Sequence, residues 1–238
     1  MLRPEGGKPS MSASTPPRFS TRWTLWAAAW VASLLVAPAV AATSPGEGAM
    51  GFSGYVAVQR LELDALNAQL TDVPALPRDG WGSGYGVTLL GPSGWGFTFV
   101  SGTYRWEARD ATGLSRLEMS HTQAGVVREV LPGPHLRLTV ALLGGLVSAE
   151  LDLVGDAPTR YDEFTMNRFT RRLVSLQPEV GLLWRLGPTT SLQATASYLL
   201  AGDFWHSRWA HPWGSTLEGL PGWFRGPSLR LALGVGGP

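Results

Sequence analysis

The groups best able to do chemistry in this sequence are the histidines and the serines and carboxylates near them; the histidines are His121, His135, His206 and His211. A serine nucleophile needs a histidine base within hydrogen-bond reach, and that base is oriented by an acid. Ser115 or Ser120, His121 and Glu118 supply these three groups. Adjacent residues of a strand point to opposite faces, so Ser120 and His121 cannot meet directly. We therefore expect no catalytic residue and no enzymatic activity.

A metal site is a second possibility, because His206 and His211 share a segment with Asp203 and Glu218. Zinc sites use three or four protein ligands at suitable spacing. No helix holds these four side chains in place, so we expect no metal and no other cofactor. The sequence contains no cysteine, which also excludes disulfides, thiolate nucleophiles and cysteine-ligated metals.

Five charged residues fall in segments that resemble strands, and we expect them to face the interior of a barrel: Arg116, Glu118, Glu179, Arg185 and Arg230. An unpaired buried charge costs several kcal/mol, so these residues should form ion pairs that fill the lumen. A gated polar pore is the alternative, but eight strands leave little room for a wide channel.

Aromatic residues gather in the segment 201–226 and at two strand ends; the candidates are Trp184, Tyr198, Trp205, Trp209, Trp213 and Trp223. Amphipathic rings favour interfaces that are wet on one side and apolar on the other. We expect Trp184 and Tyr198 to lie at two membrane interfaces. The segment 201–226 should anchor the chain in the outer leaflet or pack as a lid, and binding of a surface ligand or protein is the alternative.

The elements that position these residues are strands, because apolar and polar residues alternate with a period of two. The clearest segments are 174–186, 191–200 and 228–235. Noisier segments that are rich in β-branched and aromatic residues lie at 51–60, 81–91, 94–108, 113–130 and 135–153. In 94–108, a bulge near Ser101-Gly102 would keep the aromatic residues on one face. Residues 63–70 have helical spacing and predict a short helix capped by Asp64.

The lengths of the connections alternate along the chain. Short Gly/Pro turns join the second strand to the third, the fourth to the fifth and the sixth to the seventh, whereas connections 61–80, 154–170 and 201–226 are long. An up-and-down barrel with an even number of strands has short turns at one end and long loops at the other. We therefore predict an all-β fold, an eight-stranded antiparallel transmembrane barrel, over residues 51–238.

A leader precedes this domain. Residues 1–22 carry four basic residues, 23–36 are apolar, and an Ala-Val-Ala sequence ends at residue 41. This pattern predicts a signal peptide over 1–41, followed by a linker over 42–50. Only 16% of the residues are charged, against roughly 25% in ordinary domains. The net charge of +1 gives no general attraction to nucleic acid.

The chain resembles the small bacterial outer-membrane barrels of the OmpA/OmpX size class in its leader, its strand number and its loop parity. It is also similar to Gly-rich outer-membrane proteins with an L-x-x-L-N-x-x-L segment, here residues 63–70, ahead of a Gly/Tyr-rich strand, here 82–86. The resemblance implies secretion to the bacterial outer membrane, outer-membrane lipid as partner, and a structural, anchoring or surface-interaction role.

Two other functions stay open at this stage. An apolar face can point to a core as well as to lipid, so a soluble, secreted or periplasmic lipocalin-like barrel that binds an apolar ligand is the first alternative. A membrane-embedded lipid-modifying enzyme is the second, because the groups around His121 resemble those of membrane lipid deacylases.

Overall fold

The computed structural model describes residues 49–70, 73–155, 167–203, 208–211, 216–217 and 220–236. The predicted signal peptide 1–41 lies outside the described residues, as does nearly all of the predicted linker 42–50. Among the described residues, no helix has the length and apolar character that crossing a membrane requires.

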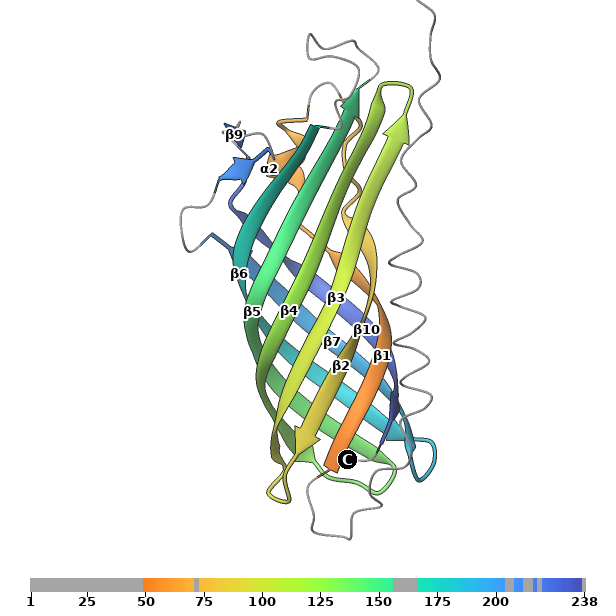
Figure 1. The fold of residues 1–238 in the computed structure, drawn as a ribbon. Helices are drawn as coiled ribbons and strands as arrows, with labels where there is room; N and C mark the ends of the chain where they lie inside the picture. Colours follow the sequence, from red (N-terminus) through yellow and green to blue (C-terminus); the bar gives the residue numbers. More distant parts are fainter. Residues whose placement is uncertain are drawn as a thin grey trace, which may run out of the picture. The chain divides into compact units, whose positions relative to one another are not determined.

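Within these residues, eight long strands form one antiparallel sheet: β1 (Ala49–Arg60), β2 (Asp79–Leu90), β3 (Trp95–Asp110), β4 (Gly113–Leu131), β5 (Leu136–Gly155), β6 (Asn167–Arg185), β7 (Thr190–Gly202) and β10 (Trp223–Val235). Each strand pairs with its neighbour in the chain, and β10 pairs with both β7 and β1. This last pairing closes the sheet into a barrel (Figure 1). The predicted all-β, eight-stranded antiparallel barrel is confirmed.

The connections follow the predicted parity. The tight turns 91–94, 132–135 and 186–189 lie at the same end as the start of β1 and the end of β10, which we call the turn end. The helix α2 (Asp64–Asn67) and the short strands β8 (Trp209–Ala210) and β9 (Thr216–Leu217) lie at the opposite end, which we call the loop end (Figure 1). Asp64 does not cap α2 with its side chain; it pairs instead with Arg78.

The bulge predicted in 94–108 is wrong. β3 keeps one register with β2 and β4 through Ser101 and Gly102, so the expected bulge is not there. Phe97 and Phe99 face outward while Tyr104 faces inward, because the two ends of the strand have different surroundings. The register shift lies instead between Glu129 and Leu131 of β4.

β6 is longer than predicted, because it begins at Asn167 and not near residue 174. The first seven residues of β6 carry Arg168, Thr170 and Arg172 on the outer face. In the sequence alone, such polar residues are typical of a loop. The pairing of 167–173 with β5 is nevertheless continuous. As a result, β3 to β6 extend further toward the loop end than β1 and β10 do.

Candidate functional site

The middle of the lumen is occupied by a buried ion pair. Arg230 of β10 donates a hydrogen bond of 2.7 Å from Nη2 to Oε2 of Glu179 on β6, and the two side chains are only 8% and 6% exposed. Gln177 Nε2 donates to the other carboxylate oxygen of Glu179 at 2.9 Å and to Ser197 Oγ at 3.0 Å. The guanidinium group of Arg230 also lies 5.1 Å from the centre of the Tyr55 ring. Arg230, Glu179 and Gln177 therefore each have a polar partner, whereas the buried Oγ1 of Thr195, the register partner of Arg230, has none among the described residues.

Aromatic side chains fill the same level of the barrel. Tyr55 Oη lies 3.0 Å from His121 Nε2, and the His121 ring stacks on Tyr104 with a centroid distance of 5.3 Å. The hydroxyl of Tyr104 reaches Ser228 Oγ at 3.4 Å. His121 is thus part of the lumen packing, and its ring nitrogen is used by a tyrosine.

The alternate glycines of β2 leave the space for these rings. An added Cβ on Gly82 would lie 2.4 Å from the Tyr104 ring and 2.6 Å from the Thr103 carbonyl oxygen. A Cβ on Gly80 would fall inside the Trp106 ring. In this Gly/Tyr-rich strand, the glycines on the inner face therefore leave space for the aromatic side chains of neighbouring strands.

Above this layer, toward the loop end, the lumen contains an apolar core. Its fully buried members come from all around the barrel and include Trp106, Leu117, Leu151, Leu173 and Phe224. Two loop elements close it: Leu66 of α2 is buried, and Trp209 of β8 is 1% exposed with its ring edge-on to Phe224. The indole N–H of Trp209 donates to the carbonyl of Pro221 at 3.3 Å.

Below the ion pair, toward the turn end, a cavity of about 60 Å³ has a mixed lining, in which hydroxyl and amide side chains such as Thr88, Thr98 and Gln193 lie beside apolar ones such as Val127 and Leu183. A volume of this size holds a few water molecules. The lumen thus has a small cavity of mixed lining at the turn end and is blocked in the middle, and at the loop end it is mainly apolar apart from the buried ion pair of Arg171 and Asp203.

The outer face has the opposite arrangement. Near the turn end it is a continuous band of exposed apolar side chains on every strand, including Val56, Leu89, Phe97, Val126, Leu142, Val180, Leu200 and Leu231. Nearer the loop end, the outer face of β3 to β6 is polar and charged. The polarity of each of these four strands therefore reverses on both faces along its length.

β4 shows this reversal most clearly. In its turn-end half, Val126 faces outward and is exposed. In its loop-end half, Leu117 and Met119 face the lumen and are buried, while Arg116 and Glu118 face outward. The register joins Ser101, Thr122, Leu146 and Val174 in one row across the four strands, and the reversal occurs at or within one residue pair of this row in each.

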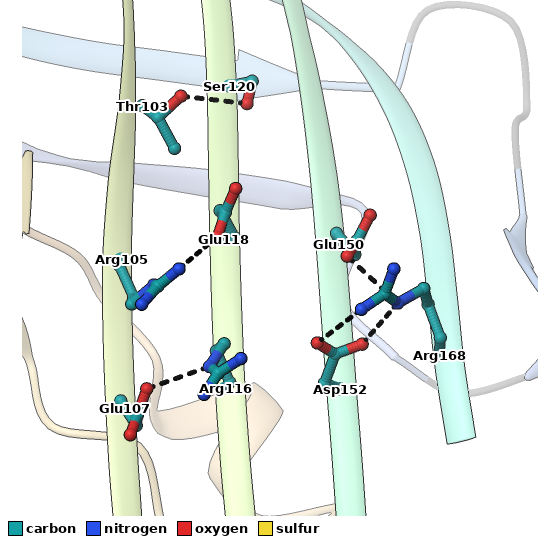
Figure 2. Close-up of polar contacts among 9 residues, drawn as sticks. All are labelled: Thr103, Arg105, Glu107, Arg116, Glu118, Ser120, Glu150, Asp152 and Arg168. Atoms are coloured by element: carbon teal, nitrogen blue, oxygen red, sulfur yellow. Dashed lines mark hydrogen bonds and ion pairs between the residues drawn. The ribbon is translucent and has the colours of Figure 1, made fainter. Parts of the chain in front are cut away.

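The charged region of the outer face, which we call the outer wall, consists of Arg105, Glu107, Arg109, Arg116, Glu118, Glu150, Asp152, Arg168 and Arg172. Its ion pairs run across neighbouring strands: Arg105 Nη2 to Glu118 Oε2 at 3.1 Å, and Arg116 Nε to Glu107 Oε2 at 2.9 Å (Figure 2). Arg168 Nε contacts both Glu150 Oε1 at 3.0 Å and Asp152 Oδ1 at 2.8 Å.

Glu150 is a carboxylate of the outer wall with a raised pKa. It lies beyond the apolar band, directly opposite Glu118 in the β4–β5 register. Partial burial raises the pKa of Glu150 above its ordinary value, and the charges of Asp152 and Glu118 raise it further against the opposing effect of Arg168. The hydrogen bond to Asp152 raises the pKa of Arg168.

The structure divides the five predicted interior charges. Glu179 and Arg230 lie in the lumen and pair with each other, and Arg185 lies on the inner face of β6 near the turn end. The prediction is wrong for Arg116 and Glu118, which lie on the outer face. At their level, the lumen holds packed apolar side chains, and the exterior accepts charge.

The predicted aromatic candidates also divide. Trp184, Tyr198 and Trp223 face outward, Trp184 near the turn end and Trp223 at the loop end, where it is 67% exposed. Trp209 instead packs inward as part of the lid. Trp205 and Trp213 lie outside the described residues.

The groups of the hypothetical serine–histidine–acid site lie on different faces of the sheet. Ser120 is exposed on the outer face, while His121 is buried in the lumen and bonded to Tyr55, so the two cannot act together. Ser115 shares the inner face with His121, but Glu118 lies on the other side of the sheet. Among the described residues, no group of three potential metal ligands is found; His206 and Glu218 lie outside them.

Sequence analysis missed the outer wall and the apolar core behind it, although β4 contains a signal for both. Leu117 and Met119 occupy odd positions, whereas Ala124 and Val126 occupy even ones, so the apolar phase changes by one residue around His121–Gln123. A change of phase without a bulge means that the environment of each face has changed.

A closed antiparallel barrel of eight long strands, with a filled lumen and an apolar outer band, has the fold of the small bacterial outer-membrane barrels. Among solved structures, the attachment invasion locus protein Ail of Yersinia pestis is similar, with 16% identity and a TM-score of 0.50 over 80% of this chain and 99% of that chain. Neisserial surface protein A has 12% identity and a TM-score of 0.49 over 78% of this chain and 96% of its own. OprG of Pseudomonas aeruginosa has 10% identity and a TM-score of 0.44 over 82% of this chain and 99% of its own. The likeness to Ail shows the fold. No protein-family model matches the sequence, and no curated protein does.

Proposed function

We propose that this chain is a protein of the bacterial outer membrane that spans the bilayer as a barrel and has a structural, anchoring or surface-interaction role without catalysis. The observation that carries this proposal is the reversal of polarity along β3 to β6. A barrel in water keeps a polar outer face along the whole strand, whereas a barrel in lipid needs an apolar outer face only where hydrocarbon surrounds it.

The height of the apolar band supports the proposal. On β5 the band extends from Leu136 to Leu146, a segment of eleven residues of which every second one faces outward. At about 3.3 Å per residue and a tilt of about 40°, this segment spans roughly 28 Å along the barrel axis. The apolar band of outer-membrane barrels is about 25 Å tall. Trp184 near one edge and Tyr198 toward the other occupy positions that suit membrane interfaces.

The filled lumen favours this role over the two alternatives. A soluble barrel that binds an apolar ligand needs a cavity of several hundred Å³, whereas the cavity in this lumen is about 60 Å³ and has a mixed polar and apolar lining. A lipid-modifying enzyme of the Ser/His type needs its two groups on one face, and Ser120 and His121 lie on opposite faces. Surface contacts would then involve the loop end, where Trp223 is exposed and Trp209 is not.

A pair of matched arginine substitutions tests the proposal. Leu231 lies in the middle of the apolar band on β10, and Ser120 lies on the polar outer surface of β4. In phosphatidylcholine vesicles, Leu231→Arg should reduce the free energy of unfolding by about 2–4 kcal/mol, and Ser120→Arg by less than about 1 kcal/mol.

The measurement is urea unfolding followed by tryptophan fluorescence, together with fractionation of cells that express the native chain. Equal costs for the two variants would contradict the proposal. Recovery of the mature chain in the soluble fraction without detergent would also sink it.

A further inference from the structure

The outer wall begins where the apolar band ends. On β5 the last apolar outward residue is Leu146, and the outward residues that follow are Ser148, Glu150 and Asp152. If the band lies in hydrocarbon, the next layer on this side is the lipid headgroup layer, and the outer wall is the part of the protein that faces it. The chemistry of the outer wall therefore decides which headgroups it favours.

Arginine dominates the exposed part of the outer wall. Five guanidinium groups lie there against four carboxylates, and the Asp152 carboxylate is almost fully buried beneath Arg168. Arg105 is 55% exposed, and its ion pair with Glu118 engages one of its three nitrogen atoms. Arg116 likewise contacts Glu107 through Nε alone. A guanidinium group has five N–H donors, so the remaining donors of Arg105 and Arg116 can reach a ligand on the outer side.

The carboxylates hold these arginines in place. Glu107 and Arg116 are register partners across β3–β4, as are Arg105 and Glu118. A guanidinium group that is already oriented by a carboxylate loses less side-chain freedom when it binds a second anion. Guanidinium groups bind phosphate through two parallel hydrogen bonds, which suits the remaining nitrogen pair.

We propose that the outer wall binds the phosphate-bearing headgroups of lipids in the leaflet at the loop end of the barrel. This inference rests on the proposed function, because it requires the band to lie in a bilayer. The site is one-sided: it covers β3 to β6, since only these strands continue well past the band, while β1 ends at Arg60 and β10 begins at Trp223.

A second copy of the chain is a poorer occupant. A twofold axis along the membrane normal through the centre of the outer wall would pass near Glu118 and Glu150, which are opposite each other in the β4–β5 register. The two copies would then bring four carboxylates together, and like charges at close range are unfavourable. A lipid phosphate meets the exposed arginines instead.

The test uses the full mature chain in phosphatidylcholine vesicles, to which purified lipopolysaccharide is added in intact or dephosphorylated form. The variant Arg105→Gln/Arg116→Gln removes two guanidinium groups from the outer wall. The matched control is Arg60→Gln/Arg225→Gln, whose two arginines are 58% and 61% exposed, against 55% for Arg105 and 26% for Arg116. They are also paired with carboxylates and lie on β1 and β10. The number of lipopolysaccharide molecules retained and their affinity are measured by native mass spectrometry.

We expect the outer-wall variant to bind intact lipopolysaccharide at least roughly tenfold more weakly than the native chain, because each charge-assisted hydrogen bond lost changes affinity by about this factor. The control should bind like the native chain, and dephosphorylated lipopolysaccharide should bind weakly to all three. Arg105→Lys/Arg116→Lys should recover part of the affinity.

Insertion into vesicles without lipopolysaccharide separates the two proposals, since a failure to insert would refute the proposed function itself. With insertion intact, equal affinities for the outer-wall variant and the native chain would refute this inference alone, and so would an equal loss in the control. Stronger binding of a soluble sulfated polysaccharide than of lipopolysaccharide would replace the lipid headgroup by a free glycan and also overturn it.

Discussion

Replacing Glu179 by Gln breaks the ion pair in the middle of the lumen while nearly preserving its shape. In the native chain, Arg230 and Glu179 are 2.7 Å apart and almost fully buried. The substitution leaves the guanidinium charge of Arg230 without its carboxylate. The Tyr55 ring, 5.1 Å away, is then its remaining favourable neighbour among those identified.

The expected cost follows from these surroundings. Removing one partner of a buried pair typically costs about 3–5 kcal/mol, because a buried charge is left uncompensated. Here two features place the cost at the lower end: the Tyr55 ring stabilises the cation by roughly 0.5–2 kcal/mol, and the adjacent cavity of about 60 Å³ admits water. We therefore expect a loss of about 3 kcal/mol, which lowers the ratio of folded to unfolded chains roughly 150-fold.

The assay is urea unfolding in phosphatidylcholine vesicles, with tryptophan fluorescence as the signal. The double variant Glu179→Gln/Arg230→Gln should cost less than Glu179→Gln alone, because no unpaired charge remains. Glu62→Gln is the control, since it breaks the exposed pair with Arg225 and should cost less than about 1 kcal/mol. If Glu179→Gln costs no more than Glu62→Gln, or if the double variant costs more than Glu179→Gln alone, the reasoning about the lumen is refuted.

Three further predictions use the same unfolding assay. Gly82→Ala should cost about 1–3 kcal/mol, because its Cβ would overlap the Tyr104 ring, whereas Gly54→Ala has no atom within 4 Å of the new Cβ and should be near neutral; similar costs would contradict the close packing. Trp209→Ala should cost about 3 kcal/mol or more and expose the backbone of 208–211 to protease, while Trp223→Ala should leave both properties nearly unchanged; the reverse order would refute the inward packing of Trp209. Glu150→Gln should stabilise the chain at pH 7 by about a few tenths of a kcal/mol. Because burial raises the pKa of Glu150, its folded state binds a proton more readily than its unfolded state, so this gain should vanish below about pH 4, and a gain that persists there would contradict it.

The part of the barrel inside the apolar band could be predicted from sequence because each face there has one environment. In 174–186 and 228–235 the alternation is unbroken, and the structure places Glu179 and Arg230 inside and Leu231 outside. The parity of the connections followed from their lengths alone, since antiparallel neighbours reverse direction at each turn.

The loop end could not be predicted in the same way, because there the apolar residues face the lumen and the charged residues face outward. The sequence predicts Arg116 and Glu118 to lie in the lumen as members of ion pairs, but at their level the apolar side chains Leu117 and Met119 occupy the lumen and the charges face outward. Arg168 and Arg172 made the start of β6 resemble a loop for the same reason. Which side of the sheet is apolar above the band depends on the loop residues that fill the lumen, such as Leu66 and Trp209, and these come from distant parts of the chain.

The low charge content of the sequence takes a specific meaning from this arrangement. Within the apolar band, charges are restricted mainly to the lumen, where space allows only a few and each needs a partner, as Glu179 and Arg230 have. Past the band, the outer surface of four strands carries nine charged side chains within a short distance. If the apolar band lies in a bilayer, as proposed, the placement of charge marks the boundary of the hydrocarbon. A substitution that moves a charge across that boundary should disturb the protein more than one that changes its total charge.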